Sequence, residues 1–523
     1  MEKYHHARRK RSFFCIDLKS FYASVECVDR GLDPFTTDLV VADPTRSKNT
    51  ICLAVSPSLK GKGVRNRCRL REIPRDVHCI VARPRMHRYM EVSVRVYRCY
   101  LSFASPCDVY PYSIDECFID AAPYLRLYDV PPRLLARRII DHVREETGVT
   151  ATAGIGTNLF LAKVALDIMA KHADDGIGVL DAVLFKRHIW FHRPLTDIWG
   201  IGPGIERRLA KRGIHDLAGV CAERPESLWR MFGKNAEFLI DHAWGLEPCT
   251  IDDIRSYRPR ARSMHNGQVL MRDYSALEAR TILREMIHES CMELVSHDLM
   301  CGSVGLHIGY SSAARESLSH GSASRSAGCA MGSARYAGGA LGASINGQAE
   351  TSADVLGSEV SMRAVSENAS RSFLRVEPAR DDKRLCGDRG LSHRGVPKGT
   401  SRDTALVQGL AVAGSAGGQR MLDHPTDSEH AIARVLLGMF DTQVDEAALI
   451  RRVNISLGDL RAARFVGRSL FDDTAVEVRE RAVASAMVAV RKRFGNNALL
   501  RGTSLKSESN ARERNCQIGG HHA

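Results

Sequence analysis

Three carboxylates in the first 120 residues belong to apolar segments. Asp115 and Glu116 are adjacent within YSIDECFID (112–120), and Asp17 ends the apolar run of RSFFCIDL (11–18). Strands disfavour Asp and Glu, and a carboxylate on a buried surface is costly without a partner. An Asp-Glu pair alone is usually a solvated hairpin tip. The third carboxylate, at the end of the same kind of segment, favours a site in which the three share a partner.

Divalent cations are the partner that this chemistry favours. Three carboxylates converging from adjacent strands would repel one another, and Mg²⁺ binds a few carboxylates together with substrate phosphate oxygens. Two such ions stabilise the attacking and leaving oxygens of a displacement at phosphorus. We therefore expect Asp17, Asp115 and Glu116 to hold two Mg²⁺ ions for phosphoryl transfer, with the backbone carbonyl of Leu18 as a further oxygen ligand.

Short apolar strands alternate with helical segments from residue 11 to about residue 181. Strands are predicted at RSFFCIDL (11–18), ICLAVSPS (51–58), DVYPYSIDECFID (108–120) and TATAGIGT (150–157). Helices are predicted at KSFYASVECVDRG (19–31), RYMEVSVRVYRCYLSF (88–103), PPRLLARRIIDHVREETG (131–148) and NLFLAKVALDIMAKHA (158–173). This order indicates an α+β fold built around a mixed sheet.

The rest of the chain changes character several times. Residues 195–250 have helical spacing, and residues 253–310 return to helix and strand. Residues 311–425 are rich in Ser, Gly and Ala, which predicts a flexible insert because few large apolar residues remain to offset the entropy of ordering. A helix (428–444), a strand (449–457) and a charged helical tail follow.

A glycine-rich turn in LTDIWGIGPGIERRLAKRGIHDLAGV (195–220) predicts phosphate binding. Glycines let backbone N–H groups approach a phosphate closely, and the helix that follows adds its positive N-terminus. The candidate residues are Gly200, Gly202, Gly204, Arg207, Arg208, Lys211 and Arg212. Together they resemble a helix-hairpin-helix, which grips a duplex backbone without reading sequence.

Composition agrees with a large nucleic-acid-binding protein. The chain has 523 residues, a formal net charge of +13 and a pI of about 9.1, which indicate several domains and a polyanionic partner. Its 15 cysteines contain no C-x-x-C pair, so we expect reduced thiols in a cytoplasmic protein and neither disulfides nor a zinc site. The N-terminus lacks a signal-peptide pattern and no apolar run is long enough to span a membrane.

Several ordered motifs resemble one family. IDLKSFYASVE, YSIDECFID and NLFLAKVALDIMAKH are similar to the palm motifs of Y-family translesion DNA polymerases. ICLAVSPSLKGKGV, ARPRMHRYMEVSVRVY, FLIDHAWGLEPCTI and LIRRVNISL resemble the UmuC-like branch found in Gram-positive bacteria. The resemblance covers residues 11–310 and 428–460 and extends to the C-terminal tail.

The resemblance implies a right-hand polymerase. Its expected parts are a palm (11–28 and 78–190), fingers (29–77), a helical thumb (191–252), an α+β little finger (253–310 and 426–460), the insert (311–425) and a charged tail (461–523). Within the little finger, Arg451 and Arg452 flank an alternating strand. They suit phosphate tracking, or they are ordinary solvated arginines at a strand end.

The resemblance also implies substrate contacts. Asp17, Asp115 and Glu116 match the metal-binding carboxylates, and Tyr22 falls on the position whose ring excludes a 2′-hydroxyl. Lys163 matches a basic residue that contacts the triphosphate, and Lys60 is the corresponding cation of the fingers. Many members carry a Tyr and an Arg in that part of the fingers. Here Pro57 and Lys60 stand near those places, and Ser56 and Ser58 are alternative hydrogen-bonding residues.

The expected function is error-prone, lesion-bypass synthesis in DNA repair and the SOS response, with primer-template DNA and dNTPs as substrates. The alternatives are a non-catalytic or regulatory DNA-binding protein that keeps the fold, and a palm-fold nucleotide cyclase. The chain is expected to be a monomer. GRSLFDD (467–473) contains Leu470 and Phe471, which either bind the sliding clamp or form an apolar staple on the little finger.

Overall fold

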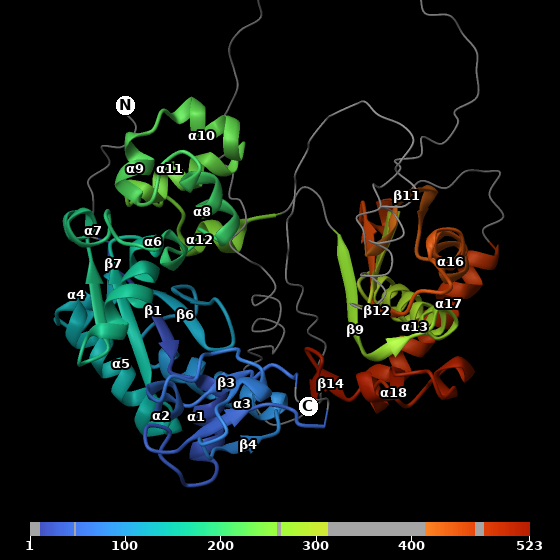
Figure 1. Cartoon of the computed structure of the whole chain (residues 1–523), viewed down its shortest axis with the longest axis horizontal. Coiled ribbons are helices and arrows are strands. Elements are labelled where there is room, and N and C mark those ends of the chain that lie inside the picture. Colours follow the sequence, from blue (N-terminus) through green and yellow to red (C-terminus); the bar gives the residue numbers. More distant parts are fainter. Residues whose placement is uncertain (1–10, 46–48, 259–262, 312–413, 466–474, 523) are drawn as a thin grey trace, which may run out of the picture. The chain divides into compact units, whose positions relative to one another are not determined.

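A computed structural model of the chain describes residues 11–45, 49–258, 263–311, 414–465 and 475–522. These residues form two compact units, one that extends to Tyr257 and one that runs from Arg258 to Gly520 (Figure 1). In the first unit the elements are, in chain order, β1 (Phe13–Leu18), α1 (Phe21–Val28), β2 (Leu39–Val41), β3 (Ala54–Val55), α2 (Pro57–Gly61), β4 (Ile80–Ala82), α3 (Met86–Leu101), β5 (Val109–Pro111), β6 (Glu116–Asp120), α4 (Ala122–Leu127), α5 (Pro132–Thr147), β7 (Ala151–Gly156), α6 (Leu159–Val164), β8 (Ile177–Leu180) and α7 (Ala182–His188).

A five-stranded sheet in the order β5-β6-β1-β7-β8 forms the centre of the first unit. β1 pairs antiparallel with β6 and β7, while β7 and β8 are parallel, so the predicted mixed sheet is confirmed. Successive side chains of β1 point to opposite faces of the sheet, as in any strand. Phe14 and Ile16 pack with α1, α3 and α5, whereas Phe13 and Cys15 pack with α6. Asp17 therefore belongs to the face that α6 covers.

The helical segment after β7 lies unusually close to the sheet. It is predicted as one helix and is helical throughout, but its winding changes from α6 to a π turn (Ala165–Met169) and then to a 3₁₀ turn (Ala170–His172). A Cβ atom on Gly154 or Gly156 would lie 2.0–2.1 Å from backbone atoms of Ala162. Glycine is therefore required at both positions, because the Cβ atom of any other residue would clash with the helix at this distance.

A three-stranded sheet in the order β3-β2-β4 and the short helix α2 form the region expected to be the fingers. The strand predicted at 51–58 is wrong at its end, because β3 contains only Ala54 and Val55. Ser56 instead caps α2 by accepting a hydrogen bond from the N–H of Leu59, and Pro57 occupies the first helical turn. Both residue types favour a helix start over a strand.

Residues 195–250 are helical as predicted. The helices are α8 (Pro203–Ala210), α9 (Leu217–Ala222), α10 (Pro225–Phe232), α11 (Asn235–Ala243) and α12 (Ile251–Ser256). Their core includes Leu209, Leu217, Leu228 and Leu239, and it continues into Phe160 of α6. α6 is thus packed between the central sheet and this helical bundle.

The second unit is a sheet with helices on one face. Its strands β9 (Met264–Tyr274), β10 (Leu299–Tyr310), β11 (Ser415–Thr426) and β12 (Ile450–Gly458) have the order β11-β10-β12-β9, and the two-residue strand β13 (Arg461–Ala462) pairs with β10. Helices α13 (Ala276–Ser296) and α16 (Glu429–Gln443) share the apolar core with the sheet. This arrangement agrees with an α+β little finger.

The predicted insert is too long at its C-terminal end. Residues 415–426 form β11, which pairs with β10 from Gly309↔Ser415 to Cys301↔Thr426. The N–H of Tyr310 donates to the carbonyl of Gly414 at 3.2 Å. The chain therefore leaves the sheet at 311 and returns beside the same place at 414; residues 312–413 lie outside the described residues.

The segment predicted as a charged tail belongs to the second unit up to Gly520. This part of it contains α17 (Ala475–Phe494), α18 (Ala511–Arg514) and the short strand β14 (Gln517–Ile518). Arg491 is 7% exposed and bonds Glu289 at 2.9 Å, and Ser509 donates to Glu285 at 2.5 Å. Its charges thus anchor it to α13 instead of dispersing it in solvent. Leu470 and Phe471 lie outside the described residues.

The 13 cysteines that the structure describes are free thiols. Among the described helices, none is long and apolar enough to cross a membrane.

Candidate active site

Asp17 and Glu116 occupy directly opposite positions on the neighbouring strands β1 and β6. Side chains of opposite residues share one face of a sheet, so the strand register brings the two carboxylates together. The N–H of Leu18 donates to the carbonyl of Asp115 at 3.0 Å, which fixes the third acid beside them. The three acids therefore lie near one another at the adjoining ends of β1 and β6, and their role as metal ligands stays a prediction.

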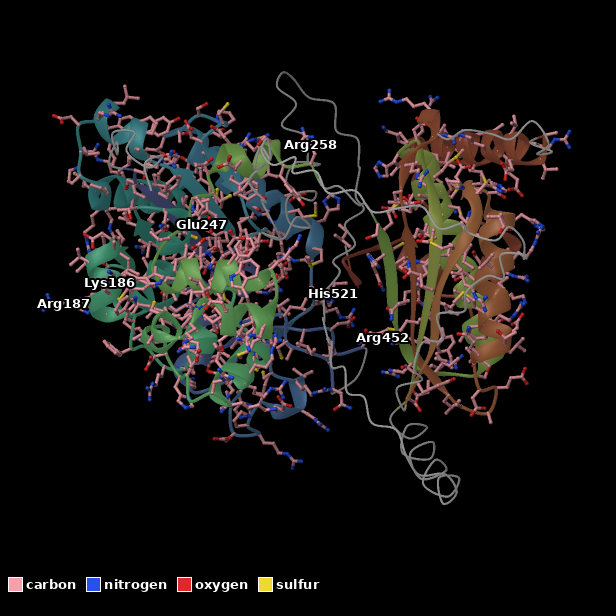
Figure 2. The ribbon with its side chains drawn as sticks, turned by 90° about the horizontal axis from the view of Figure 1, so that it is seen from above. Lys186, Arg187, Glu247, Arg258, Arg452 and His521 are labelled. Atoms are coloured by element: carbon pink, nitrogen blue, oxygen red, sulfur yellow. The ribbon has the colours of Figure 1, made fainter. Side chains whose placement is uncertain are left out.

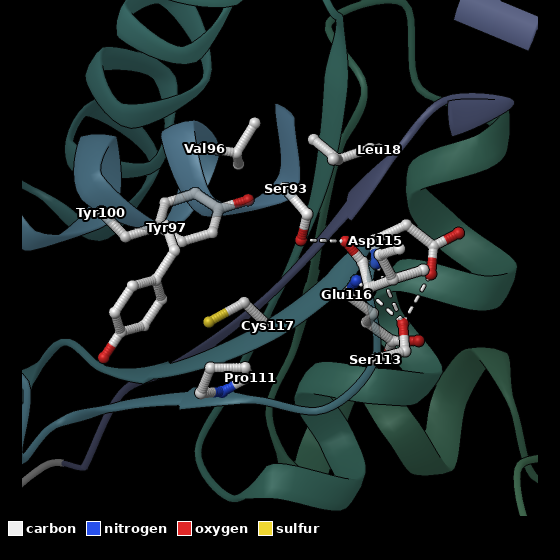
Figure 3. Close-up of a pocket in the computed structure, with 11 residues that line it drawn as sticks. Leu18, Ser93, Val96, Tyr97, Tyr100, Pro111, Ser113, Asp115, Glu116 and Cys117 are labelled. Carbon is white, nitrogen blue, oxygen red and sulfur yellow. Dashed lines mark hydrogen bonds between the residues drawn. The ribbon is translucent and has the colours of Figure 1, made fainter. Parts of the chain in front are cut away.

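Ser113 shapes the turn that presents Asp115 and Glu116. Its hydroxyl accepts hydrogen bonds from the N–H groups of Asp115 and Glu116 at 3.2 and 3.0 Å, and it donates to Asp115 Oδ1 at 2.5 Å (Figure 3). Ser93 of α3 supports the same turn by donating to the carbonyl of Ile114 at 2.5 Å. Sequence analysis missed Ser113, although a Ser two residues before an Asp in a tight turn is a signal for this role.

Glu116 is held by two donors from the α6 side of the sheet. Lys163 Nζ lies 2.9 Å from Oε1 and 3.0 Å from Oε2, and the thiol of Cys15 donates to Oε1 at 3.0 Å. The side chains of Glu116 and Lys163 are only 10% and 12% exposed. Lys163 also pairs with Asp167 at 3.1 Å, one helical turn further on. Cys15 and Asp167 were not among the predicted site residues; the four-residue spacing from Lys163 to Asp167 could have indicated that pair.

Burial of these acids changes their proton affinity. It raises the pKa of Asp17 from 3.8 to about 8, with further contributions from the charges of Asp115 and Glu116. Burial also raises the pKa of Glu116, against the opposing effect of Lys163. For Lys163 burial lowers the pKa, but the effects of Glu116, Cys15 and Asp167 together outweigh it and the net pKa is raised. Asp17 and Glu116 therefore bind protons more readily than isolated carboxylates would.

The three acids suit Mg²⁺ by donor type but are not arranged as a metal cage. Within the described ranges, no group of three His, Cys, Asp or Glu side chains is placed to hold a metal ion. The hydrogen bonds explain this, because Asp115 Oδ1 is turned to Ser113 and both oxygens of Glu116 face Lys163. Since all the donors are oxygens and a cation already sits on Glu116, the residues fit a hard divalent ion after Glu116 releases Lys163.

Tyr22 lies on α1 beside this cluster. Its ring stacks on Tyr89 of α3 with centroids 4.3 Å apart. Burial raises the pKa of Tyr22, and the charge of Asp115 contributes, which places the ring near the acids. The hydroxyl of Tyr89 donates to the fully buried Glu26 at 2.8 Å. Tyr89, which sequence analysis missed, thus supports the ring of Tyr22 from a fixed position.

Lys60 reaches the same region from α2. Its ammonium donates to Ser20 Oγ at 2.8 Å. Burial lowers its pKa while the charge of Asp17 raises it. The two alternative fingers residues have other roles, since Ser56 caps α2 and Ser58 donates to Asp38 at 2.7 Å. Lys60 is therefore a cation that α2 brings toward the acids.

The glycine-rich turn is an open feature of the first unit. Gly200 has a φ of +87°, and a Cβ atom on Gly200, Gly202 or Gly204 would meet no atom within 4 Å. Arg207 and Lys211 at the following helix are exposed. Their neighbour Arg208 packs over the ring of Phe232 at 4.4 Å and donates to the carbonyl of Met231 at 3.0 Å. The turn thus combines accessible backbone with the exposed cations Arg207 and Lys211. Arg208 differs from them because it also packs against α10.

The two arginines of β12 differ in their surroundings. Arg451 forms an ion pair with Asp273 at 3.3 Å. Arg452, labelled in Figure 2, is exposed and lies opposite Val269 of β9. Arg452 is therefore the better candidate of the two for an external anion.

Comparisons with known proteins match the part of the chain that contains this site. The model of the impB/mucB/samB family matches residues 16–167, which include the three acids and Lys163. The Bacillus subtilis (strain 168) protein UvrX, named for UV-damage repair, is 33% identical over 305 residues, 58% of this chain and 71% of that protein. DNA polymerase IV 2 of the same organism is 26% identical over 521 residues, 98% of this chain and 99% of that protein. DNA polymerase IV 2 of Halalkalibacterium halodurans is 31% identical over 300 residues, 56% of this chain and 71% of that protein.

One solved structure has the same fold. A chimeric Y-family DNA polymerase assembled from Dbh and Dpo4 superimposes with a TM-score of 0.52 at 16% identity, covering 85% of this chain and 98% of the chimera.

Proposed function

The chain belongs to the Y family of DNA polymerases, in its UmuC-like branch, and we propose on this basis that it copies damaged template strands by adding dNTPs to a primer 3′ end. The observation that carries the proposal is the register that sets Asp17 opposite Glu116. With Asp115 beside them, the site supplies three oxygen donors next to two lysines. This is the donor set that a nucleotidyl transfer needs.

Asp17, Asp115 and Glu116 would hold the divalent ions, with the Leu18 carbonyl as a further ligand. When bound, two Mg²⁺ ions neutralise the charge that develops on the reacting phosphate and on the oxygens that enter and leave. Ser113 orients Asp115 through its hydroxyl. The buried sheet behind the acids keeps their backbone fixed, so no reorganisation of the strands is needed when substrate arrives.

Two lysines would bind the triphosphate. Lys163 approaches from the α6 side and Lys60 from α2, and both are near Asp17 or Glu116. Tyr22, stacked on Tyr89, would lie against the sugar and exclude a 2′-hydroxyl. These contacts assign charge recognition to the lysines and sugar selection to the tyrosine.

The remaining parts would bind DNA. We assign residues 11–28 and 78–190 to the palm, 29–77 to the fingers and 191–252 to the thumb. The little finger would comprise 264–311, 414–465 and the C-terminal segment that packs on α13. Gly200, Gly202, Gly204, Arg207 and Lys211 would grip the duplex backbone, with Arg208 contributing in part. A cytoplasmic monomer that the sliding clamp recruits through Leu470 and Phe471 remains our prediction.

Primer extension on undamaged and abasic templates tests the function. The purified full chain should extend both primers with Mg²⁺ and dNTPs, and Asp115→Asn should extend neither while still binding primer-template DNA. Binding without extension by the wild-type chain would instead support a regulatory DNA-binding protein. Cyclisation of a nucleoside triphosphate without template would support the cyclase alternative.

A further inference from the structure

Asp167 is a charged residue of the site to which the proposed reaction gives no role. It lies on the π turn after α6, and its carboxylate is 3.1 Å from Lys163 Nζ. The same ammonium is 2.9 Å from Glu116. The three side chains are 25%, 12% and 10% exposed for Asp167, Lys163 and Glu116. One largely buried cation is therefore shared between a carboxylate expected to bind metal and one that is not.

Lys163 and a divalent ion compete for Glu116. Both oxygens of Glu116 lie within 3.0 Å of the ammonium, so a metal ion at Glu116 would face a positive charge at contact distance. The ammonium must move away from Glu116 when metal binds. A desolvated ammonium without an anionic partner is costly. Asp167 is the anion already in contact with it.

The backbone keeps Asp167 in place whatever Glu116 binds. A Cβ atom on Gly154 or Gly178 would clash with backbone atoms of the helical segment, at 2.0 Å from Ala162 and 2.3 Å from Ala165. This close packing fixes the π turn against the sheet. From the exposed side, Lys171 lies 3.9 Å from Asp167. Asp167 is thus an anion that the fold holds beside Lys163.

We propose that Asp167 is a positioning residue that takes over Lys163 when a divalent ion binds Glu116. In the metal-free protein Lys163 neutralises Glu116. On metal binding it pivots to Asp167, stays within the site and is presented to the triphosphate. The inference deepens the proposed function and rests on its assignment of Glu116 as a metal ligand. Without the charge of Asp167, Lys163 would remain on Glu116 and oppose metal binding.

A double-mutant cycle on Mn²⁺ binding tests this without turnover. Free Mn²⁺ is measured by electron paramagnetic resonance with the full chain and no nucleotide. Asp167→Asn should weaken Mn²⁺ binding about fivefold, a coupling typical of contacting charges. Lys163→Gln should tighten it, since the competing cation is gone. In the Lys163→Gln background, Asp167→Asn should have little further effect.

Matched variants separate this effect from general electrostatics. Asp174→Asn removes the same charge from an exposed position shortly after the same helical segment and should leave Mn²⁺ affinity within about twofold. Asp167→Glu retains the charge and should restore binding. Equal weakening by Asp167→Asn with and without Lys163 would overturn the proposal, because Asp167 would then attract the ion directly. Unchanged affinity in Asp167→Asn would overturn it as well.

The outcome is independent of whether the chain is a polymerase. If the wild-type chain fails to extend primers but the cycle shows coupling, the proposed function fails while the Lys163–Asp167 switch stands. If the chain extends primers but the two substitutions are additive, only the switch is rejected. Thermal melting of each variant shows whether it is folded, and an unfolded Asp167→Asn is replaced by Asp167→Ser in the same cycle.

Discussion

The ring of Tyr22 lies flat on the ring of Tyr89, with centroids 4.3 Å apart and an interplanar angle of 13°. Because Tyr89 is fully buried and bonded to Glu26, the stack gives Tyr22 a fixed position on the side of the site where Asp115 lies. A fixed ring beside the acids is what discrimination against a 2′-hydroxyl requires, since a mobile ring would move aside.

We expect Tyr22→Ala to raise the efficiency of ribonucleotide incorporation relative to deoxyribonucleotide incorporation by roughly tenfold or more, because it removes the ring that the extra hydroxyl would meet. Steady-state insertion of a matched rNTP and dNTP measures the ratio. Tyr22→Phe keeps the ring and serves as the control. An unchanged ratio in Tyr22→Ala would make Tyr22 a packing residue only.

Removing one carboxylate should separate chemistry from DNA binding. Asp17→Asn and Asp115→Asn should each lower primer extension roughly a thousandfold, since each removes a proposed metal ligand with little change of shape. DNA affinity, measured by fluorescence anisotropy, should change by less than about threefold because the proposed duplex contacts lie elsewhere. Near wild-type extension by either variant would contradict the metal assignment.

The raised pKa of Asp17 predicts how stability depends on pH. The folded, metal-free protein keeps a proton on Asp17 up to about pH 8, whereas an ordinary Asp releases it near 3.8. The stability from this proton is complete below the unfolded pKa and is lost as pH rises through the folded pKa. We expect the melting temperature of the wild type to fall more than that of Asp17→Asn between about pH 5 and pH 8.5.

Magnesium supplies the control for this pH effect. The proposed ligand of the ion is the ionised form of Asp17, so the affinity for Mg²⁺ should rise with pH over the same range and offset the loss of stability in the wild type only. If the melting temperatures of the wild type and Asp17→Asn fall equally with pH, both with and without Mg²⁺, the pKa of Asp17 is not raised in the folded protein.

The exposed cations that follow the glycine-rich turn should govern the salt dependence of DNA binding. Replacing Arg207 and Lys211 by Ala should weaken binding and reduce the slope of log affinity against log salt by about 2, because two phosphate contacts are lost. Arg230→Ala removes an exposed charge from α10 and is the matched control. If the slope of log affinity against log salt does not change, Arg207 and Lys211 do not contact the duplex.

Two deletions test where the insert ends and the folded chain begins again. Replacing residues 315–410 by a short Gly/Ser joint should leave a soluble, active chain, because Tyr310 and Gly414 are already hydrogen-bonded neighbours and closing a short loop costs little. Extending the deletion to 425 should give an insoluble or inactive chain, since it removes β11 and exposes the edge of β10. Solubility, circular dichroism and primer extension measure both. Equal behaviour of the two deletions would mean that β11 is dispensable.

Much of the fold and the chemistry could be predicted from local sequence. Short apolar runs predicted β1 and β7, helical spacing with flanking Pro and Gly predicted α5, and acids within apolar segments pointed to Asp17, Asp115 and Glu116. These features depend on residues close together in the chain. The Gly-rich start of β11 could not be predicted from local sequence. SAGGQ has the composition of a linker and is a strand only through its pairing with β10.

Only the tertiary structure decided which residues contact one another in the site. The sequence contains Cys15, Lys163 and Asp167, but which of them meets Glu116 depends on strand register and on how closely the glycines of β7 let α6 approach. The same is true of Tyr89 beneath Tyr22, and of the C-terminal helix that local composition presents as a charged tail. In each case the partner is distant in sequence, and a charge or a ring takes its role from the partner that packing brings to it.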